Sequence, residues 1–195
     1  MMAFKGTHGD MTCTYGTGRY QYSLGQTLRE ENSKARRTGL HCAENPLEIL
    51  HWYPLGQGNR YFRVEAGGSI DELGGGNDSQ LSCTEMTLIE ELDVKKLAGY
   101  AMLYICSHPS RKWKQTGEKL EVKEEEACGA GAGSIAIARG RNPKVKGAAG
   151  SVLGLIKEDE SGLIEVAKVF TVEGEIAPDT WYTITPARIL KEAIK

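Results

Sequence analysis

The chain has 195 residues, of which 40% are hydrophobic and 26% are charged. This composition allows a hydrophobic core and excludes global disorder, and the length suits one medium domain or two small ones. Lysine and arginine number 24 against 26 aspartates and glutamates, so the formal charge is −2. Proteins that bind duplex nucleic acid normally carry a basic excess, so the charge argues against that class.

The chain lacks the sequence signals of membrane insertion, export and structural zinc. No stretch approaches the roughly 18 consecutive apolar residues of a membrane helix, and Met1–Thr12 has no apolar segment of the signal-peptide kind. We therefore expect an intracellular protein without a membrane partner. The five cysteines are an odd number and include no Cys-x-x-Cys pair, so we expect free thiols and no metal site.

The first half of the chain predicts both strands and helices. Thr38–Ala43 is typical of a short buried strand, and Asn45 is placed to cap a helix over Leu47–Tyr53. Arg60–Ala66 alternates in the way expected of a strand. We therefore expect an α+β domain over residues 1–106.

The chain changes character after this domain. Charge blocks at 107–126 indicate a linker or an exposed helix. In 127–195, the small-residue run Ala132–Ala138 returns in looser form at Ala149–Leu155, seventeen positions later. Strands of small and β-branched residues separated by glycine turns favour a short, mostly β domain of the β-roll or solenoid type. A hairpin that turns at Asp159–Gly162 would cap it.

This expected β-roll bears on assembly. Roughly three or more repeats are normally needed to bury a solenoid core, and this chain offers two. We therefore expect a homotrimer through residues 127–195, in which other copies supply the missing surface.

Two histidines suggest acid–base chemistry. His41 lies in the expected strand and His51 on the expected helix, so both could face one pocket with Glu44 or Glu48. Equally, His41 could only donate to a backbone carbonyl inside the core. Both interpretations stay open.

A binding interpretation rests on aromatic and basic residues. Trp52 and Tyr53 end the expected helix directly before a turn that Arg60 follows, which suits a planar phosphorylated ligand. The loops Gly16–Tyr20 and Gly56–Arg60 each join glycines to an arginine, and they are either phosphate loops or ordinary turns.

A cationic cluster lies further along the chain. It is made up of Arg139, Arg141, Lys144 and Lys146. In a trimer these side chains would repeat around the axis and form a ring that binds anions. The alternative is that they are solvated turn residues.

Several segments resemble an uncharacterised family of phage and prophage proteins. The resemblance covers residues 3–105 and is carried by Phe4–Gly6, Tyr20–Tyr22, Gly39–Leu47 and Arg60–Ala66. Its most specific part is the block Gly-Leu-His-Cys-Ala-Glu-Asn-Pro. The repeats of the last third look like the coils of trimeric adhesin heads. The resemblance implies a viral setting and a trimer, but no activity.

The order of elements is also similar to that of ADP-ribosyltransferases. That resemblance implies NAD as a substrate, with Lys5 or His8 at the nicotinamide ribose and Tyr53 stacked on nicotinamide. Glu85 would stabilise the oxocarbenium-like transition state. The sequence holds no P-loop, no GxGxxG motif after a strand, and no HExxH or GxSxG motif.

These observations favour a viral accessory protein without catalysis or cofactor, acting in the cytoplasm of an infected bacterium. It would sequester a small anionic ligand, such as a nucleotide immune signal, or block a host defence protein. An ADP-ribosyltransferase-like enzyme is the alternative, and a structural virion component is the third possibility.

Overall fold

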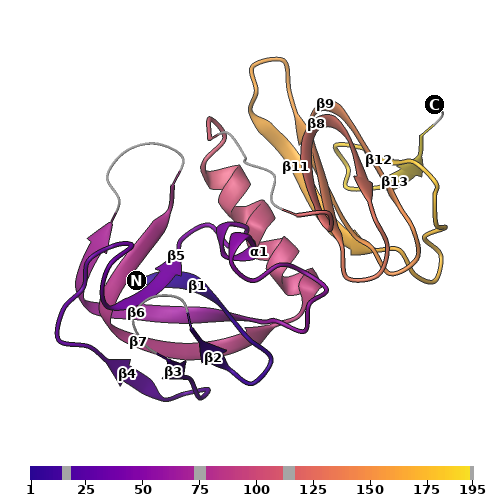
Figure 1. Ribbon diagram of the computed structural model, residues 1–195. Coiled ribbons are helices and arrows are strands. Elements are labelled where there is room, and N and C mark those ends of the chain that lie inside the picture. The colour runs from indigo at the N-terminus through magenta and orange to yellow at the C-terminus, as the bar shows by residue number, and fades with distance from the viewer. Residues whose placement is uncertain (15–18, 73–77, 112–116, 194–195) are drawn as a thin grey trace. The chain divides into compact units, whose positions relative to one another are not determined.

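A computed structural model gives the fold, and it describes residues 1–14, 19–72, 78–111 and 117–193 (Figure 1). Half of the chain is in strands and a tenth is in helices. The chain divides into two compact units, Met1–Asp93 and Val94–Lys195.

The first unit is built from strands that close into a ring. Its main strands are β1 (Met2–Thr7), β4 (Thr27–Arg29), β5 (Leu40–Ala43), β6 (Arg60–Glu72) and β7 (Gln80–Leu92). β1 pairs with both β5 and β6, and β7 pairs with the same two strands, all antiparallel. β4 joins β7, and the short strands β2 (Thr12–Cys13) and β3 (Tyr20–Gln21) pair with each other.

The core of this unit follows from the alternation of its strands. Leu40, Phe62 and Leu88 are at most 1% exposed, as expected for apolar residues on the inner face of a sheet. One charged residue shares this environment, because Lys5 on β1 is only 4% exposed.

The helix expected over Leu47–Tyr53 is only a short 3-10 helix, η1 (Glu48–His51). The Asn45 side chain does accept the Leu47 N–H at 2.9 Å, as a capping residue would. The Glu48 carboxylate, however, accepts the N–H of Ser79 at 2.8 Å instead of turning back toward the cap. Seven residues before a proline offer too few hydrogen bonds to sustain an α-helix.

The second unit contains helix α1 (Val94–Ser107) and a six-stranded sheet. Its strands are β8 (Leu120–Gly129), β9 (Ile135–Gly147), β10 (Val152–Glu158), β11 (Ile164–Thr171), β12 (Tyr182–Ile184) and β13 (Leu190–Glu192). β9 lies between β8 and β10 and is parallel to both. The remaining pairs are antiparallel, including the predicted β10–β11 hairpin.

The predicted fold class is wrong. The described part of the first unit contains no α-helix, so it is not an α+β domain. The second unit is a helix with a mixed sheet instead of a β-roll, although Val152 does pair with Ile135 at the seventeen-residue spacing. The two small-residue repeats alone would leave their sheet uncovered. Antiparallel strands extend this sheet, and the helix packs on it.

The small-residue strands are buried within the single chain. Ala136 and Leu153 belong to a buried cluster with Phe170 of β11 and Tyr182 of β12. A side chain at Gly154 would come within 2.6 Å of the Met102 sulfur, so α1 packs directly on β10. The reason for expecting a trimer therefore does not hold, and the trimer stays a prediction.

The two units divide between Asp93 and Val94, whereas the sequence placed the linker at 107–126. The later part of that segment, from Leu120, lies in β8, and residues 112–116 lie outside the described part of the chain. Among the described residues, no helix is long and apolar enough to cross a membrane.

Candidate functional site

The first unit contains a cavity of about 380 Å³. Its basic lining residues are Lys5, Arg36, Arg37, His41 and His51. Its aromatic lining residues are Tyr20, Tyr22, Trp52 and Tyr53. The described lining residues include no aspartate and no glutamate, in a chain whose net charge is negative. The cavity is therefore suited to an anion that carries a flat ring.

Lys5 brings a positive charge into the interior of this unit. Its Nζ donates to the His41 carbonyl at 2.8 Å, lies 3.9 Å from the Cys13 Sγ, and lies 5.1 Å from the centre of the Tyr22 ring. None of these groups carries a negative charge in its ordinary protonation state. Burying a charge without a counter-ion is costly, so the site would gain from a bound anion.

Tyr53 forms a wall of the cavity, and its ring is held on several sides. The ring lies on β1 where Gly6 has no side chain, since a Cβ there would be 2.5 Å from the ring. The Tyr53 hydroxyl donates to the Cys13 Sγ at 2.9 Å, and its carbonyl accepts the Tyr61 hydroxyl at 3.0 Å. The His8 ring meets it edge-on at 5.4 Å. These contacts fix the ring in one position.

Two adjacent arginines lie on the exposed side of the lining. Arg36 has a left-handed backbone (φ 62°), and its guanidinium pairs with Asp78 and donates to Gln80 at 3.3 Å. Arg37 is exposed, and its side chain makes no ion pair within the described residues. Within the described residues, Arg37 is therefore the arginine of the lining that has no acidic partner.

His41 is held as a neutral ring. Its Nδ1 lies 3.1 Å from the Gly39 carbonyl, and since a carbonyl only accepts, Nδ1 carries the proton. Burial, and then the charge of Lys5, lower the pKa of His41. Its Nε2 is buried and has no hydrogen-bond partner in the described part of the chain.

The structure brings together only some of the residues that the acid–base interpretation of the histidines needs. His41 and His51 line the same cavity, but Glu44 and Glu48 are not among the lining residues. The Glu48 carboxylate is bonded to Ser79. The His41 bond to Gly39 matches the alternative that this ring serves the fold.

The residues implied by the ADP-ribosyltransferase resemblance are not all brought together. Lys5 and Tyr53 line the cavity, and His8 touches Tyr53. Glu85 lies on β7, where its carboxylate accepts the Arg29 Nε–H at 3.1 Å, and it is not a lining residue. The described lining thus lacks the glutamate that this reaction would need.

The structure also separates Arg60 from Trp52 and Tyr53, which the sequence predicted to lie together. Both aromatic residues line the cavity, whereas Arg60 donates twice to the Glu91 carboxylate, at 2.7 Å each, and lies over the Phe62 ring. Arg60 is not among the lining residues.

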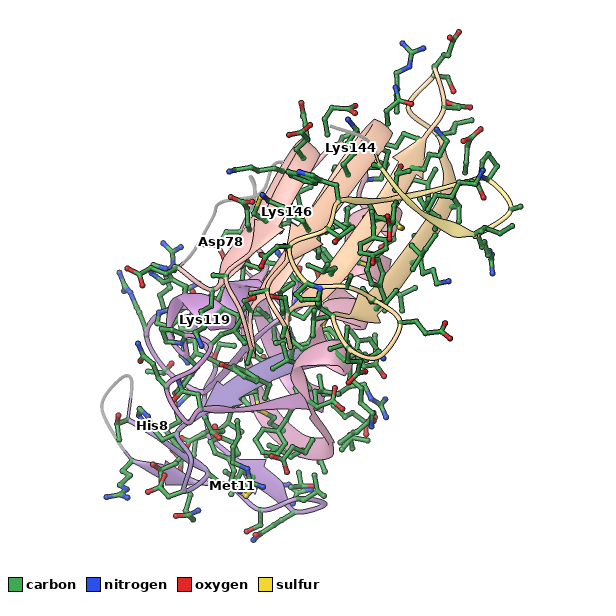
Figure 2. All side chains as sticks on the ribbon, turned by 90° about the vertical axis from the view of Figure 1, so that its right-hand side faces the viewer. His8, Met11, Asp78, Lys119, Lys144 and Lys146 are labelled. Atoms are coloured by element: carbon green, nitrogen blue, oxygen red, sulfur yellow. The ribbon has the colours of Figure 1, made fainter. Side chains whose placement is uncertain are left out.

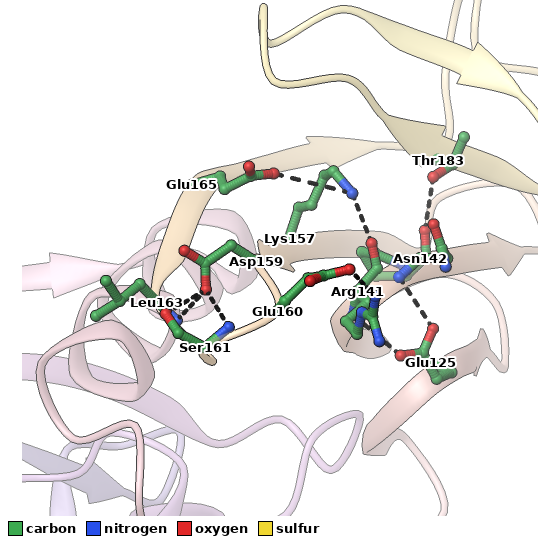
Figure 3. A network of polar contacts seen from close by, with 11 residues as sticks. Glu125, Arg141, Asn142, Lys157, Asp159, Glu160, Ser161, Leu163, Glu165 and Thr183 are labelled. Carbon is green, nitrogen blue, oxygen red and sulfur yellow. Dashed lines mark hydrogen bonds and ion pairs between the residues drawn. The ribbon is translucent and has the colours of Figure 1, made fainter.

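The cationic cluster of the second unit is occupied by contacts within that unit. The contacts are Arg139 with Glu158, Arg141 with Glu160, Lys144 with Glu126, and Lys146 with the Trp181 ring. Figure 2 shows where Lys144 and Lys146 lie. Figure 3 shows the irregular pairing of β8 with β9, where the Glu125 carboxylate accepts the N–H groups of Arg141 and Asn142 at 3.0 and 3.1 Å. Each of these four cations therefore has a partner within the second unit, and their role in anion binding stays a prediction.

Several cavity residues were missed from the sequence, chiefly Tyr22, Arg36 and Arg37. The one available signal was that both arginines come directly before the Gly39–Leu47 block. The two alternatives for the loop Gly16–Tyr20, a phosphate loop or an ordinary turn, are not tested, because residues 15–18 lie outside the described part of the chain.

In the part of the chain that the structure describes, no three His, Cys, Asp or Glu residues form a group that could hold a metal ion. Comparisons with curated proteins and with solved structures each found no match. One family matches residues 1–99, a range that contains the entire first unit and every lining residue of the cavity. The chain therefore belongs to the family described as Domain of unknown function (DUF7666).

Proposed function

We propose that the first unit is a non-catalytic binding module that takes up a small anionic ligand with a planar ring. The observation that carries the proposal is the lining of the cavity, which combines five basic and four aromatic residues without an acid among its described members. Pockets for small ligands are typically apolar or aromatic clefts of about 300–1,000 Å³ with a few placed polar groups, and this cavity fits that range.

The aromatic and cationic parts of the lining have separate roles in this proposal. Trp52 and Tyr20 are partly exposed, so they are accessible for stacking, which contributes roughly 1–3 kcal/mol per base in single-stranded nucleic-acid sites. Lys5 and Arg37 supply positive charge. An ADP-ribosyltransferase-like reaction would need a carboxylate that faces the ligand, and the described lining offers none.

The resemblance of the Gly39–Leu47 block to phage and prophage proteins supports a viral setting. In the cytoplasm of an infected bacterium, a nucleotide immune signal has the planar base and the phosphate that this lining would recognise. Sequestering such a signal would require binding alone, so the proposed role is anti-defence.

Isothermal titration calorimetry on the full chain tests the proposal. The probes are 3′,5′-cyclic AMP, AMP, NAD and uncharged adenosine. We expect at least one of the charged probes to bind, and adenosine to bind at least about tenfold more weakly than that probe. Trp52→Ala should weaken the same binding. Arg60→Gln is the matched control, because Arg60 lies outside the lining and should have no effect. The absence of binding by every charged probe at millimolar concentration, or cleavage of NAD, would overturn the proposal.

A further inference from the structure

We infer that Lys5 is the charge-selecting residue of the cavity, and that it pairs with a single compact oxyanion joined to the ligand's ring. This inference rests on the proposed function and deepens it, because it names the class of ligand. The class is a ring-bearing monoanion, whose charge is a phosphodiester or a carboxylate.

Lys5 is isolated from acidic side chains in the described lining. Its charge lies in the interior of the unit at 4% exposure, and the groups within reach of Nζ are a carbonyl, a thiol and an aromatic face. Of its three N–H donors, the His41 carbonyl takes one and the Cys13 Sγ accepts a second at 3.9 Å. The ammonium therefore keeps one donor, and the described lining around it holds no carboxylate to pair with it.

Lys5 differs in burial and charge from the other basic groups of the lining. His41 is neutral, because burial and the charge of Lys5 lower its pKa. Arg36, Arg37 and His51 are exposed, and Arg36 is already paired with Asp78. Lys5 is thus the one cation of the described lining that is deeply buried. One buried positive charge matches one negative charge, and further phosphates would have to remain on the exposed side.

A ligand-binding role of Lys5 and a purely structural role predict different effects of its removal on stability. A buried ammonium that served only the fold would be expected to have a carboxylate partner, as buried charges usually do. Replacing Lys5 by methionine keeps an unbranched side chain of similar size and removes the charge. If Lys5 is held for a ligand, that change relieves an unfavourable burial and leaves stability equal or higher. If Lys5 is held for the fold, stability falls.

The experiment compares wild type, Lys5→Met and Arg60→Met by calorimetry and by thermal unfolding. Two probe pairs each compare a monoanion with an uncharged compound that carries the same planar ring, namely 3′,5′-cyclic AMP with adenosine, and benzoate with benzamide. We expect the wild type to prefer the charged member of one pair by at least about tenfold, and Lys5→Met to remove that preference while its Tm is unchanged or raised. The pair that shows the preference identifies the oxyanion as a phosphodiester or a carboxylate.

Arg60→Met removes a surface charge outside the lining and should leave the preference intact. Binding of the charged probe by Lys5→Met with wild-type affinity overturns the inference, and so does a lowered Tm with the preference retained. If Lys5→Met does not fold, the wild-type chain still decides, because equal affinity for the two members of both pairs contradicts the inference. Failure of every probe to bind the wild type would instead overturn the proposed function itself.

Discussion

The Tyr53 hydroxyl donates to the Cys13 Sγ across 2.9 Å and joins two segments that are 40 residues apart in the chain. Cys13 ends β2, and Tyr53 follows the 3-10 helix η1. Both side chains line the cavity, and both are at most 7% exposed. This bond therefore holds one wall of the cavity to another and couples the shape of the site to the stability of the first unit.

Removing this hydroxyl should weaken the unit. Tyr53→Phe keeps the ring and deletes the donor, so we expect a loss of about 1 kcal/mol in the free energy of unfolding, the usual contribution of one hydrogen bond. Urea denaturation followed by fluorescence measures it. A stability equal to that of wild type would mean that the thiol is an insignificant acceptor.

The glycine beneath the Tyr53 ring should resist substitution. Gly6→Ala places a Cβ 2.5 Å from the ring, so the ring must move, and we expect a loss of about 1–3 kcal/mol together with weaker ligand binding. Gly99→Ala is the matched control, since a Cβ there meets nothing within 4 Å and Gly99 lies in α1. That variant should gain about 0.5–1 kcal/mol. Equal behaviour of the two alanine variants in urea denaturation would contradict the packing argument.

The exposed arginine of the lining should act on the rate of association. Arg37 lies exposed at the cavity and has no ion pair within the described residues, so we expect its charge to attract an anion. We expect Arg37→Gln to lower the association rate and its salt dependence while the dissociation rate changes little. Stopped-flow measurements at about 0.1 M and 1 M salt, where the Debye length falls from about 10 to about 3 Å, would detect this. An effect confined to the dissociation rate would place Arg37 in direct contact with the ligand.

Stability should fall as the solution becomes mildly acidic. Burial and Lys5 lower the pKa of His41 in the folded protein, whereas an unfolded histidine titrates near about 6.5. Below that pH the unfolded chain takes up a proton that the folded chain resists. The stability present above about pH 6.5 is therefore lost as the pH falls, by at most about 1.4 kcal/mol per pH unit. His41→Asn should show a smaller loss between about pH 8 and pH 5.5. Parallel pH profiles would show that another group is responsible.

The buried ion pair of the second unit should depend on both partners. The Arg139 and Glu158 side chains are 13% and 15% exposed, and Nε donates to Oε1 at 2.9 Å. Glu158→Gln leaves a buried charge without a counter-ion, so we expect a loss of about 3–5 kcal/mol that Arg139→Met in the same chain largely restores. The exposed pair of Arg141 and Glu160 is the control, and breaking it should change stability by less than about 1 kcal/mol. Additive effects of the two substitutions at the buried pair would contradict the argument.

Local patterns predicted the strands but not their arrangement. The alternation of Arg60–Ala66 marked the start of β6, and the turn at Asp159–Gly162 marked the β10–β11 hairpin, because both signals depend on neighbouring residues. The capping signal at Asn45 was also real. It could not reveal that only four residues would take up helical geometry, since that depends on how the following chain packs.

The cavity was predicted only in part, for a related reason. Lys5, Trp52 and Tyr53 were singled out from the sequence, and all three line the cavity. Arg60 was expected beside them, but the register that pairs Phe62 with Glu91 brings Arg60 to that carboxylate. Arg36 joins the lining through the pairing of β5 with β7, and register between distant strands is not visible in one sequence.

The closed ring of the first unit also constrains the order in which the chain can fold. β1 pairs with residues 60–65 of β6, and β5 pairs with the first residues of β7, so these contacts join segments far apart in the sequence. Non-local pairing of this kind slows folding, because a long loop must close before its contacts form. On the ribosome, the ring cannot close until β7 has emerged. Lys5 therefore stays solvated until β7 has emerged and is withdrawn from water in the same step that creates the cavity.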